Sequence, residues 1–220
     1  MITYTQIKHN EAINTYIKEA DSSLDALGYT EHSFAHVTRV AVTAGEILTQ
    51  LGYSEREAEL AKIAGYLHDI GNLVNRVDHS QSGAILAFRI LDRMGMAPEE
   101  IAPIVAAIGN HDEGTGVPVS SIAAALILAD KSDVRRTRVR DQKNLDLNDI
   151  HDKVNYATKS SDLTISDDKT QITLNLEIDT SVSSVMDYFE IFLGRMQMCK
   201  SAAKKLGITF KLNINGQILL

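Results

Sequence analysis

The chain has 220 residues, of which 44% are hydrophobic and 23% are charged, a composition typical of a folded globular protein and not of a disordered one. Lysine and arginine number 22 against 29 aspartate and glutamate residues, so the formal net charge is −7. This acidity argues against binding to a nucleic-acid polymer, which needs a basic surface. The single cysteine, Cys199, excludes an intrachain disulfide bond and a zinc site built from cysteines.

The hydropathy pattern contains no candidate membrane segment. The longest apolar run, residues 122–129, is much shorter than the roughly 20 residues that a spanning helix needs. The first six residues lack the basic and apolar regions of a signal peptide. We therefore expect a cytoplasmic protein that does not bind a membrane.

The first two thirds of the chain show helical periodicity. Apolar side chains recur at helical spacing over residues 33–51, and Gly52 follows as a stop signal. Ser54 and Glu57 have the spacing of a capping box, which predicts a helix that ends at Gly71. The predicted helices cover residues 10–20, 33–51, 54–71, 80–94, 98–109 and 120–133.

The last third has a different pattern. Residues 141–148 are polar and predict a connector, and Asn148 is placed to cap a short helix up to Thr158. Beyond it the hydrophobic period changes from 3.6 to 2, which indicates strands. The predicted elements are a hairpin of residues 163–165 and 172–178 that turns at 167–168, a helix over 182–205, a strand over 208–214 and a turn at 215–216.

These elements predict a mainly α fold with two parts. Residues 1–160 form a helical bundle, and residues 161–220 form a small C-terminal α+β appendage of hairpin, helix and strand. The sequence shows no internal repeat and no low-complexity tract.

Several polar side chains able to bind a metal lie beside apolar helix faces. His36, His68, His111 and Asp130 each stand three or four residues from an apolar residue of a predicted helix, and so lie on its core-facing side. Burying one such group without a partner costs roughly 2–7 kcal/mol. Four together are better explained by a shared counter-charge, and histidine with carboxylate suits a divalent transition metal.

Three motifs carry a resemblance to a known family. They are His36 in the stretch HVTRVA, the dipeptide His68-Asp69 in AGYLHDIG, and Asp130 in LADK. In their order and apolar surroundings they resemble the HD-domain metal-dependent phosphohydrolases, over about residues 30–140. The resemblance implies a compact helical bundle with a metal at its centre, held by His36, His68, Asp69 and Asp130.

Two further histidines extend the resemblance. His79 and His111 match the places that hold a second ion in the members of this superfamily that bind two metals, and Asp69 would then bridge the ions. Two ions about 3.5–4 Å apart can hold the attacking and the leaving oxygen of a displacement at phosphorus and activate a water as the nucleophile. The ions are divalent, and Fe, Mn, Mg, Ni and Zn all remain open.

One branch of the superfamily is only partly matched. Residues 109–118 are similar to a loop of the cyclic-dinucleotide phosphodiesterases, but Asn72, Asn110 and Val117 stand where that branch has lysine, histidine and tyrosine. These differences concern the substrate and not the metal site. The pair His32 and His36 has no glutamate after its first histidine, so a zincin protease site is not supported.

Basic residues supply candidates for phosphate binding. The segment 130–143 holds six basic and three acidic residues, a local charge of +3, and it contains Arg135 and Arg136. Arg76 lies between the His68-Asp69 dipeptide and the next histidine. Arginine matches phosphate oxygens well, so we expect Arg76, Arg135 and Arg136 to bind the substrate phosphate. The other interpretation of the run is a solvated helix face with salt bridges to nearby acids.

Two polar residues stand next to the ligands in sequence. Lys131 follows Asp130, and Asn72 follows Asp69 by three residues. Both are placed to contact the phosphate or the nucleophile, so Asp69, Lys131 and Asn72 are the predicted catalytic residues.

The predicted function is hydrolysis of a phosphomonoester or phosphodiester of a small nucleotide-like substrate, with a homodimer as a possible assembly. One alternative is a metal-containing nucleotide-binding regulatory module without turnover, in which the α+β appendage is the dimerising or effector part. A purely structural metal site is disfavoured, because structural sites have closed coordination. Of the other histidines, His32 is expected at the surface in preference to metal binding, His151 lacks further partners, and His9 has no predicted role.

Overall fold

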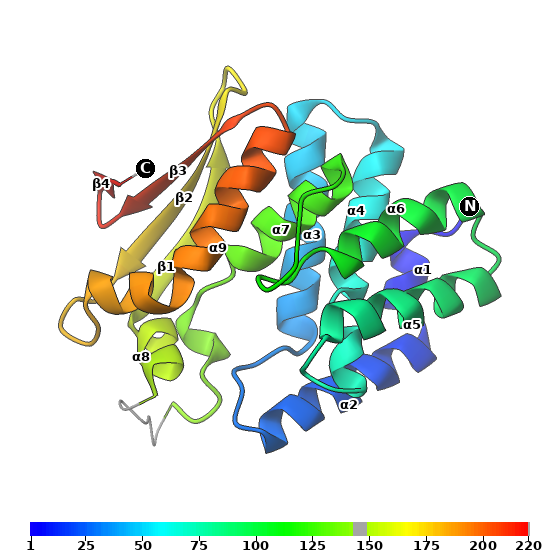
Figure 1. The fold of residues 1–220 in the computed structure, drawn as a ribbon, viewed down its shortest axis with the longest axis horizontal. Helices are drawn as coiled ribbons and strands as arrows, with labels where there is room; N and C mark the ends of the chain where they lie inside the picture. The colour runs from blue at the N-terminus through cyan, green and yellow to red at the C-terminus, as the bar shows by residue number, and fades with distance from the viewer. Residues whose placement is uncertain (143–148, 220) are drawn as a thin grey trace.

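The computed structural model describes residues 1–142 and 149–219. A body of helices occupies one side of the molecule, and a small sheet formed by the end of the chain occupies the other (Figure 1). The helix α9 (Val185–Lys205) packs against both the sheet strand β3 (Thr209–Ile214) and the central helix α7 (Ser121–Lys131). The predicted fold class, a mainly α protein with a small C-terminal α+β appendage, is confirmed. No helix within the described residues is long and apolar enough to cross a membrane.

The predicted helices of the body are present. Ser54 and Glu57 make the capping box that begins α4, and Gly52 ends α3 in the left-handed conformation with φ of 89°. The elements before α7 are α1 (Tyr4–Lys8), α2 (Glu11–Ala26), α3 (Phe34–Leu51), α4 (Glu55–Leu67), the 3-10 turn η1 (Ile70–Leu73), α5 (His79–Arg93) and α6 (Pro98–Gly109).

The helix α7 lies at the centre of the molecule. All its residues from Ile122 to Lys131 are buried, and it contacts α3, α4, α6 and α9. A helix that is apolar all round belongs in a core. Because α7 is central, the polar Asp130 near its end is held deep in the protein.

Three helix boundaries of the body differ from the prediction by two residues or more. The helix α4 ends at Leu67 and not at Gly71, because the chain turns there into η1. A Cβ on Gly71 would lie 1.9 Å from the carbonyl oxygen of His79, so only glycine lets α5 begin so close to η1. The helix α2 runs six residues beyond the predicted end at residue 20. The helix α7 ends at Lys131, two residues before the predicted end.

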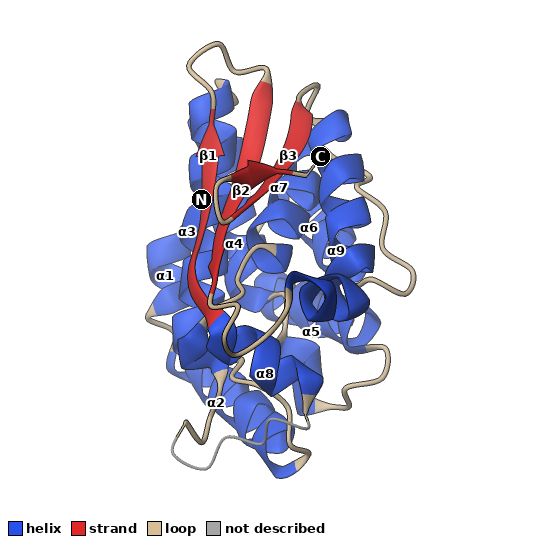
Figure 2. Cartoon of the chain, turned by 90° about the vertical axis from the view of Figure 1, so that its left-hand side faces the viewer, coloured by secondary structure: helices blue, strands red, loops and turns tan. Residues whose placement is uncertain are grey.

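The last third of the chain forms a four-stranded sheet and two helices. Its strands lie in the order β1-β2-β3-β4, with β2 and β3 parallel and the outer pairs antiparallel (Figure 2). The parallel pair is joined by α9, as a parallel connection requires. The remaining elements are α8 (Ile150–Ala157), β1 (Thr158–Ile165), β2 (Gln171–Ile178) and β4 (Gln217–Ile218). The predicted hairpin, helix and third strand are all present, although β1 begins five residues before the predicted strand and α9 begins three residues after the predicted helix start.

One hydrophobic core joins the body and the appendage. The inward residues of β2 and β3 stand side by side, as Leu174 does with Leu212, and both are fully buried. They belong to the same buried cluster as Leu126 of α7. The predicted boundary between residues 160 and 161 falls inside β1 and stays a prediction. The predicted connector lies mostly outside the described residues, as does Asn148, and Asp149 caps α8.

Candidate metal centre

Four predicted ligands meet in the middle of the helical body. His36 comes from α3, His68 directly follows α4 as its C-terminal cap, Asp69 comes next, and Asp130 comes from α7. His36 Nε2 lies 3.3 Å from His68 Nε2, 3.5 Å from Asp69 Oδ2 and 3.4 Å from Asp130 Oδ1. His68 Nε2 lies 3.2 Å and 3.6 Å from the same two oxygens. We call these four residues the first ligand group.

The two other predicted histidines lie on the far side of Asp69. His79 is the first residue of α5, and His111 follows α6. Their Nε2 atoms are 3.2 Å apart, and they lie 3.5 Å and 4.0 Å from Asp69 Oδ1. His79, His111 and Asp69 form the second ligand group. The two oxygens of Asp69 are therefore divided, with Oδ2 in the first group and Oδ1 in the second.

The hydrogen bonds of the four histidines indicate that the two groups are arranged to bind a cation. Each Nδ1 faces an acceptor at 2.6 to 3.1 Å, so in the neutral form of each ring Nδ1 carries the proton and Nε2 presents a lone pair. Lone pairs facing each other at 3.2–3.3 Å repel unless a cation lies between them. Atoms bound to one metal at about 2.0–2.2 Å stand about 3–3.5 Å apart, which matches this spacing. The acceptors are Asp133 Oδ2 for His36 and the carbonyl oxygens of Gly65 for His68, Arg76 for His79 and Ile108 for His111.

The electrostatics of the two groups differ. Burial disfavours a charged His68, but Asp69 and Asp130 outweigh it and raise the pKa of His68 to about 10. Burial, together with the nearby His68 and Lys131, lowers the pKa of His111 to about 3. Burial also lowers the pKa of His79, so the first group attracts positive charge and the second keeps its two histidines neutral. Both are properties of a site that binds a cation.

Comparison with known proteins places the fold. A family model of the HD domain matches residues 33–149, a little more than half of the chain. This chain belongs to the HD-domain family. The match includes all six ligands of the two groups, while α1, α2 and the whole C-terminal appendage lie outside it.

Two individual relatives are also similar to this HD domain. The uncharacterized protein MJ1020 of Methanocaldococcus jannaschii is 28% identical over 160 residues, which is 62% of this chain and 61% of that protein, so the chain spans less than two thirds of that relative. A crystal structure of a predicted HD superfamily hydrolase from an uncultured Thermotogales bacterium is 28% identical. That match covers 58% of this chain and 69% of the other, with a TM-score of 0.44.

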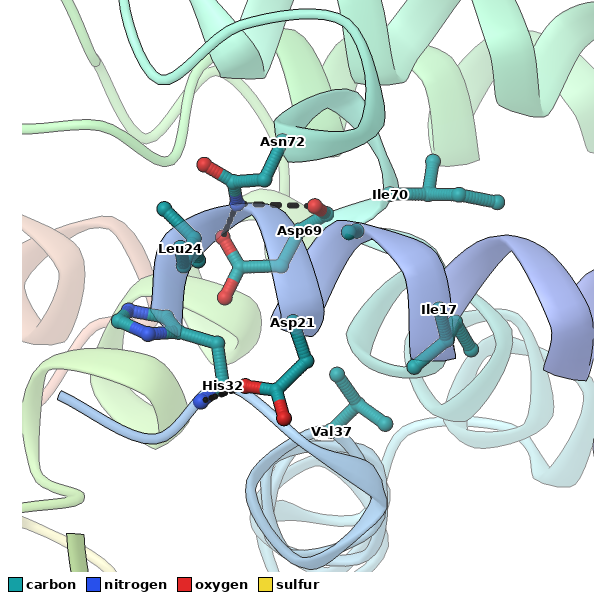
Figure 3. Close-up of a pocket in the computed structure, with 9 residues that line it drawn as sticks. Ile17, Asp21, Leu24, His32, Val37, Asp69, Ile70 and Asn72 are labelled. Atoms are coloured by element: carbon teal, nitrogen blue, oxygen red, sulfur yellow. Dashed lines mark hydrogen bonds between the residues drawn. The ribbon is translucent and has the colours of Figure 1, made fainter. Parts of the chain in front are cut away.

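Asn72 and Arg76 lie beside the second ligand group. Asn72 Nδ2 donates to Asp69 Oδ1 at 3.1 Å and to the Asp69 carbonyl oxygen at 2.9 Å, which fixes the bridging carboxylate (Figure 3). Arg76 Nη1 lies 3.4 Å from Asn72 Oδ1 and 3.4 Å from His79 Nε2. The structure therefore brings both predicted residues to the edge of the metal centre of this HD domain.

Lys131 is part of a line of alternating charges that leads away from the metal centre. Its Nζ lies 2.8 Å from Asp130 Oδ2 and 3.3 Å from Glu113 Oε2. Glu113 Oε1 in turn accepts a hydrogen bond from Arg195 Nε at 2.6 Å. Lys131 is almost fully buried, so these carboxylates compensate its charge. The line joins Asp130 to Arg195 of α9, which lies outside the HD family match.

Arg135 and Arg136 are not brought to the two ligand groups. After α7 the chain forms no helix face, only the 3-10 turn η2 (Arg136–Arg138). Arg135 pairs with Glu31 at 3.0 Å and with Asp133 at 2.9 Å. Arg136 donates a hydrogen bond to the Tyr156 carbonyl oxygen, and its guanidinium lies over the aromatic ring of Tyr156. Phosphate binding by these two arginines stays a prediction.

Two residues that act on the site were missed by the sequence analysis. Asp133 is 1% exposed and accepts a hydrogen bond from His36 Nδ1 at 2.7 Å, which orients that ligand. Its place three residues after Asp130 was the available signal, because residues at that spacing share a helix face. Arg195 had no such signal, since its partner Glu113 is distant in sequence.

The other histidines lie outside both ligand groups. His32 Nδ1 faces the Thr30 carbonyl oxygen, and its ring packs edge-on against His36. His151 lies on α8 and packs against Phe192. His9 Nδ1 faces the Thr5 carbonyl oxygen at the end of α1. None of these three histidines is part of the metal-type triads found among the described residues, which are His36–His68–Asp130 and His68–Asp69–His111.

Proposed function

We propose that this HD domain is a metal-dependent phosphohydrolase with two divalent ions. The observation that carries the proposal is the division of Asp69, whose two oxygens face two separate pairs of histidine nitrogens. A bridging carboxylate between two histidine-rich groups is the arrangement used for displacement at phosphorus. The second group has three protein ligands, which leaves positions open as in catalytic sites.

The side chains of the centre prepare it for an anionic substrate. Divalent cations held there would supply Lewis-acid activation of a water and of the phosphoryl group. Asp69 and Asp130 contribute two negative charges, fewer than the four positive charges of two ions, so the centre favours an anion. Arg76 adds a further positive charge at the edge, next to His79. Asn72 holds Asp69 in place, and Lys131 holds Asp130.

We infer a small phosphorylated, nucleotide-like substrate, in keeping with the buried position of the centre. Asp69 is 6% exposed and Asp130 is 8% exposed, so a polymer backbone has little access to them. The net charge of −7 works against a polyanion as well.

The test is metal analysis followed by turnover. Protein loaded with manganese or iron should bind about two ions per chain and hydrolyse members of a panel of aryl phosphates, aryl phosphodiesters and nucleotides. Asp69→Ala should abolish turnover, whereas Asp92→Asn, at an exposed position on α5, should not change it. No turnover by the loaded wild-type protein, or full turnover by Asp69→Ala, would contradict the proposal.

One observation favours a second candidate, a nucleotide-binding module without turnover. Lys131 is paired on both sides, with Asp130 and Glu113, and so is not free to protonate a leaving group. Tight binding of two ions and of a nucleotide without hydrolysis would favour this candidate over the enzyme.

A further inference from the structure

A cavity of about 280 Å³ lies between the HD bundle and the appendage. One wall is the segment between α2 and α3, with Tyr29 and His32, and another comes from α8 and α9, with His151 and Arg195. Both views place α8 beside α9 at the end of the molecule where α2 finishes (Figures 1 and 2). The cavity is thus formed by parts of the chain that lie almost wholly outside the HD family match.

The cavity adjoins the metal centre. Arg76 lines it and also lies 3.4 Å from Nε2 of the ligand His79. His32 lines it and packs against the ligand His36, with ring centroids 5.5 Å apart. A molecule with its phosphate at the metal centre would therefore extend into this cavity.

The charge of Arg76 is available to a ligand. Its guanidinium is half-buried, and no described carboxylate forms an ion pair with it, since its recorded partners are Asn72, His79 and the ring of Tyr29. By contrast, Arg135 and Arg195 both pair with glutamates. A half-buried arginine without a carboxylate partner is suited to a phosphate.

The remaining walls suit a planar base joined to a sugar that carries hydroxyl groups. Tyr29 is 44% exposed and lies under Arg76, whose guanidinium carbon is 5.5 Å from the ring centroid. Such a ring offers a face for stacking. Asp149 of the α8 wall carries a carboxylate, and carboxylates accept hydrogen bonds from hydroxyl groups. The volume is near the lower end of ligand cavities, roughly 300–1,000 Å³, and so suits one ring system better than two.

We propose that this junction cavity binds the nucleoside part of a nucleoside monophosphate, stacked on Tyr29, with its phosphate between Arg76 and the metal centre. This inference rests on the proposed function and assigns the appendage a part in substrate selection. A substrate with two bases exceeds the cavity.

The test compares two phosphonates that resist hydrolysis, the methylenephosphonate analogue of adenosine monophosphate and methylphosphonate. Titration calorimetry of the metal-loaded protein should show the nucleoside analogue binding at least about tenfold more tightly, because stacking of a base on an aromatic ring is of that size. Tyr29→Ala should remove this difference and leave methylphosphonate binding and metal content unchanged. His151→Ala should reduce the difference, and Tyr29→Phe should keep it.

Tyr16→Ala is the matched control, because Tyr16 is 40% exposed and lies on α2 outside the cavity lining. Equal binding of the two phosphonates by wild type, or a full preference in Tyr29→Ala, would overturn the cavity proposal while the metal centre still bound methylphosphonate. If the wild-type protein binds neither phosphonate and no metal, the proposed function itself is overturned. The two failures are therefore distinct.

Discussion

The two ligand groups of the metal centre are carried by different kinds of structure. In the first group His36 and Asp130 lie within helices, and His68 caps the C-terminal end of one. Those helices, α3, α4 and α7, pack closely, and at Gly65 a Cβ would lie 2.7 Å from the backbone of Ala41. In the second group His79 begins α5 and His111 stands at the start of a loop.

The supports of the two groups also differ in origin. His36 is held by Asp133, which lies inside the HD family match. The loop after His111 is held by α9 of the appendage, through the Glu113–Arg195 pair and through Gly116, where a Cβ would lie 2.8 Å from Met198 Cε. The first group is thus held mainly within the HD bundle and reaches α9 only through Lys131 and Glu113, whereas the loop of the second group contacts α9 directly. We expect the first ion to bind more tightly.

The largest expected effect comes from removing one histidine from each group. His68→Ala should weaken binding of the first ion by more than about 100-fold, beyond the roughly 10–100-fold cost of losing an outer partner of a ligand. His111→Ala should leave one ion bound per chain. Metal content after dialysis against a weak chelator measures both effects, and His9→Ala, at an exposed position, is the control. Loss of both ions in His111→Ala would show that the groups are not separable.

A smaller effect is expected from Asp133→Asn. This change removes the negative charge that faces His36 Nδ1 at 2.7 Å but preserves the shape, so affinity for the first ion should fall by about 10–100-fold. Binding of the second ion should not change. Asp133 and Asp162 both pair with Arg39, but Asp162 is exposed, so Asp162→Asn is a matched control. Equal effects of the two substitutions would mean that Asp133 acts through Arg39 and not through the ligand.

The first group could be predicted from sequence for a local reason. His36 and Asp130 lie on helices whose apolar faces already show which side is buried, and the His68-Asp69 dipeptide has a recognisable context. The end of α4 could not be placed, because Gly71 looks like a stop signal but serves the close approach of α5. The helix α1 has five residues, too few to show a period.

Tertiary contacts of the appendage could not be predicted at all. Glu113 and Arg195 are 82 residues apart and meet only because α9 packs on α7. The sequence of the basic run after α7 predicts either a phosphate-binding cluster or a solvated helix face. The run forms only the short 3-10 turn η2 and no part of the ligand groups, because Arg135 and Arg136 find partners on neighbouring segments.

A still smaller effect tests the coupling to the appendage. Arg195→Gln removes a partly exposed ion pair, worth up to about 1 kcal/mol, so affinity for the second ion should fall by about fivefold at most. Affinity for the first ion should fall less, because Arg195 reaches Asp130 only through Glu113 and Lys131. Lys200→Gln, an exposed position on the same helix, is the control. A loss confined to the first ion would reverse the assignment of α9 to the second group.

The smallest effect concerns stability and its pH dependence. Burial raises the pKa of Glu113, but Lys131 and Arg195 outweigh it and lower the pKa to about 2, below the ordinary value of 4.5. A lowered pKa stabilises the folded state above pH 4.5, and this contribution is lost as pH falls from 4.5 towards 2. For the metal-free protein, urea unfolding should therefore show wild type more stable than Glu113→Gln by about 1 kcal/mol at pH 6, with the difference shrinking at pH 3. Glu46→Gln, exposed on α3, should show no such change, and a difference for Glu113→Gln that is constant with pH would mean that the carboxylate charge does not hold the loop.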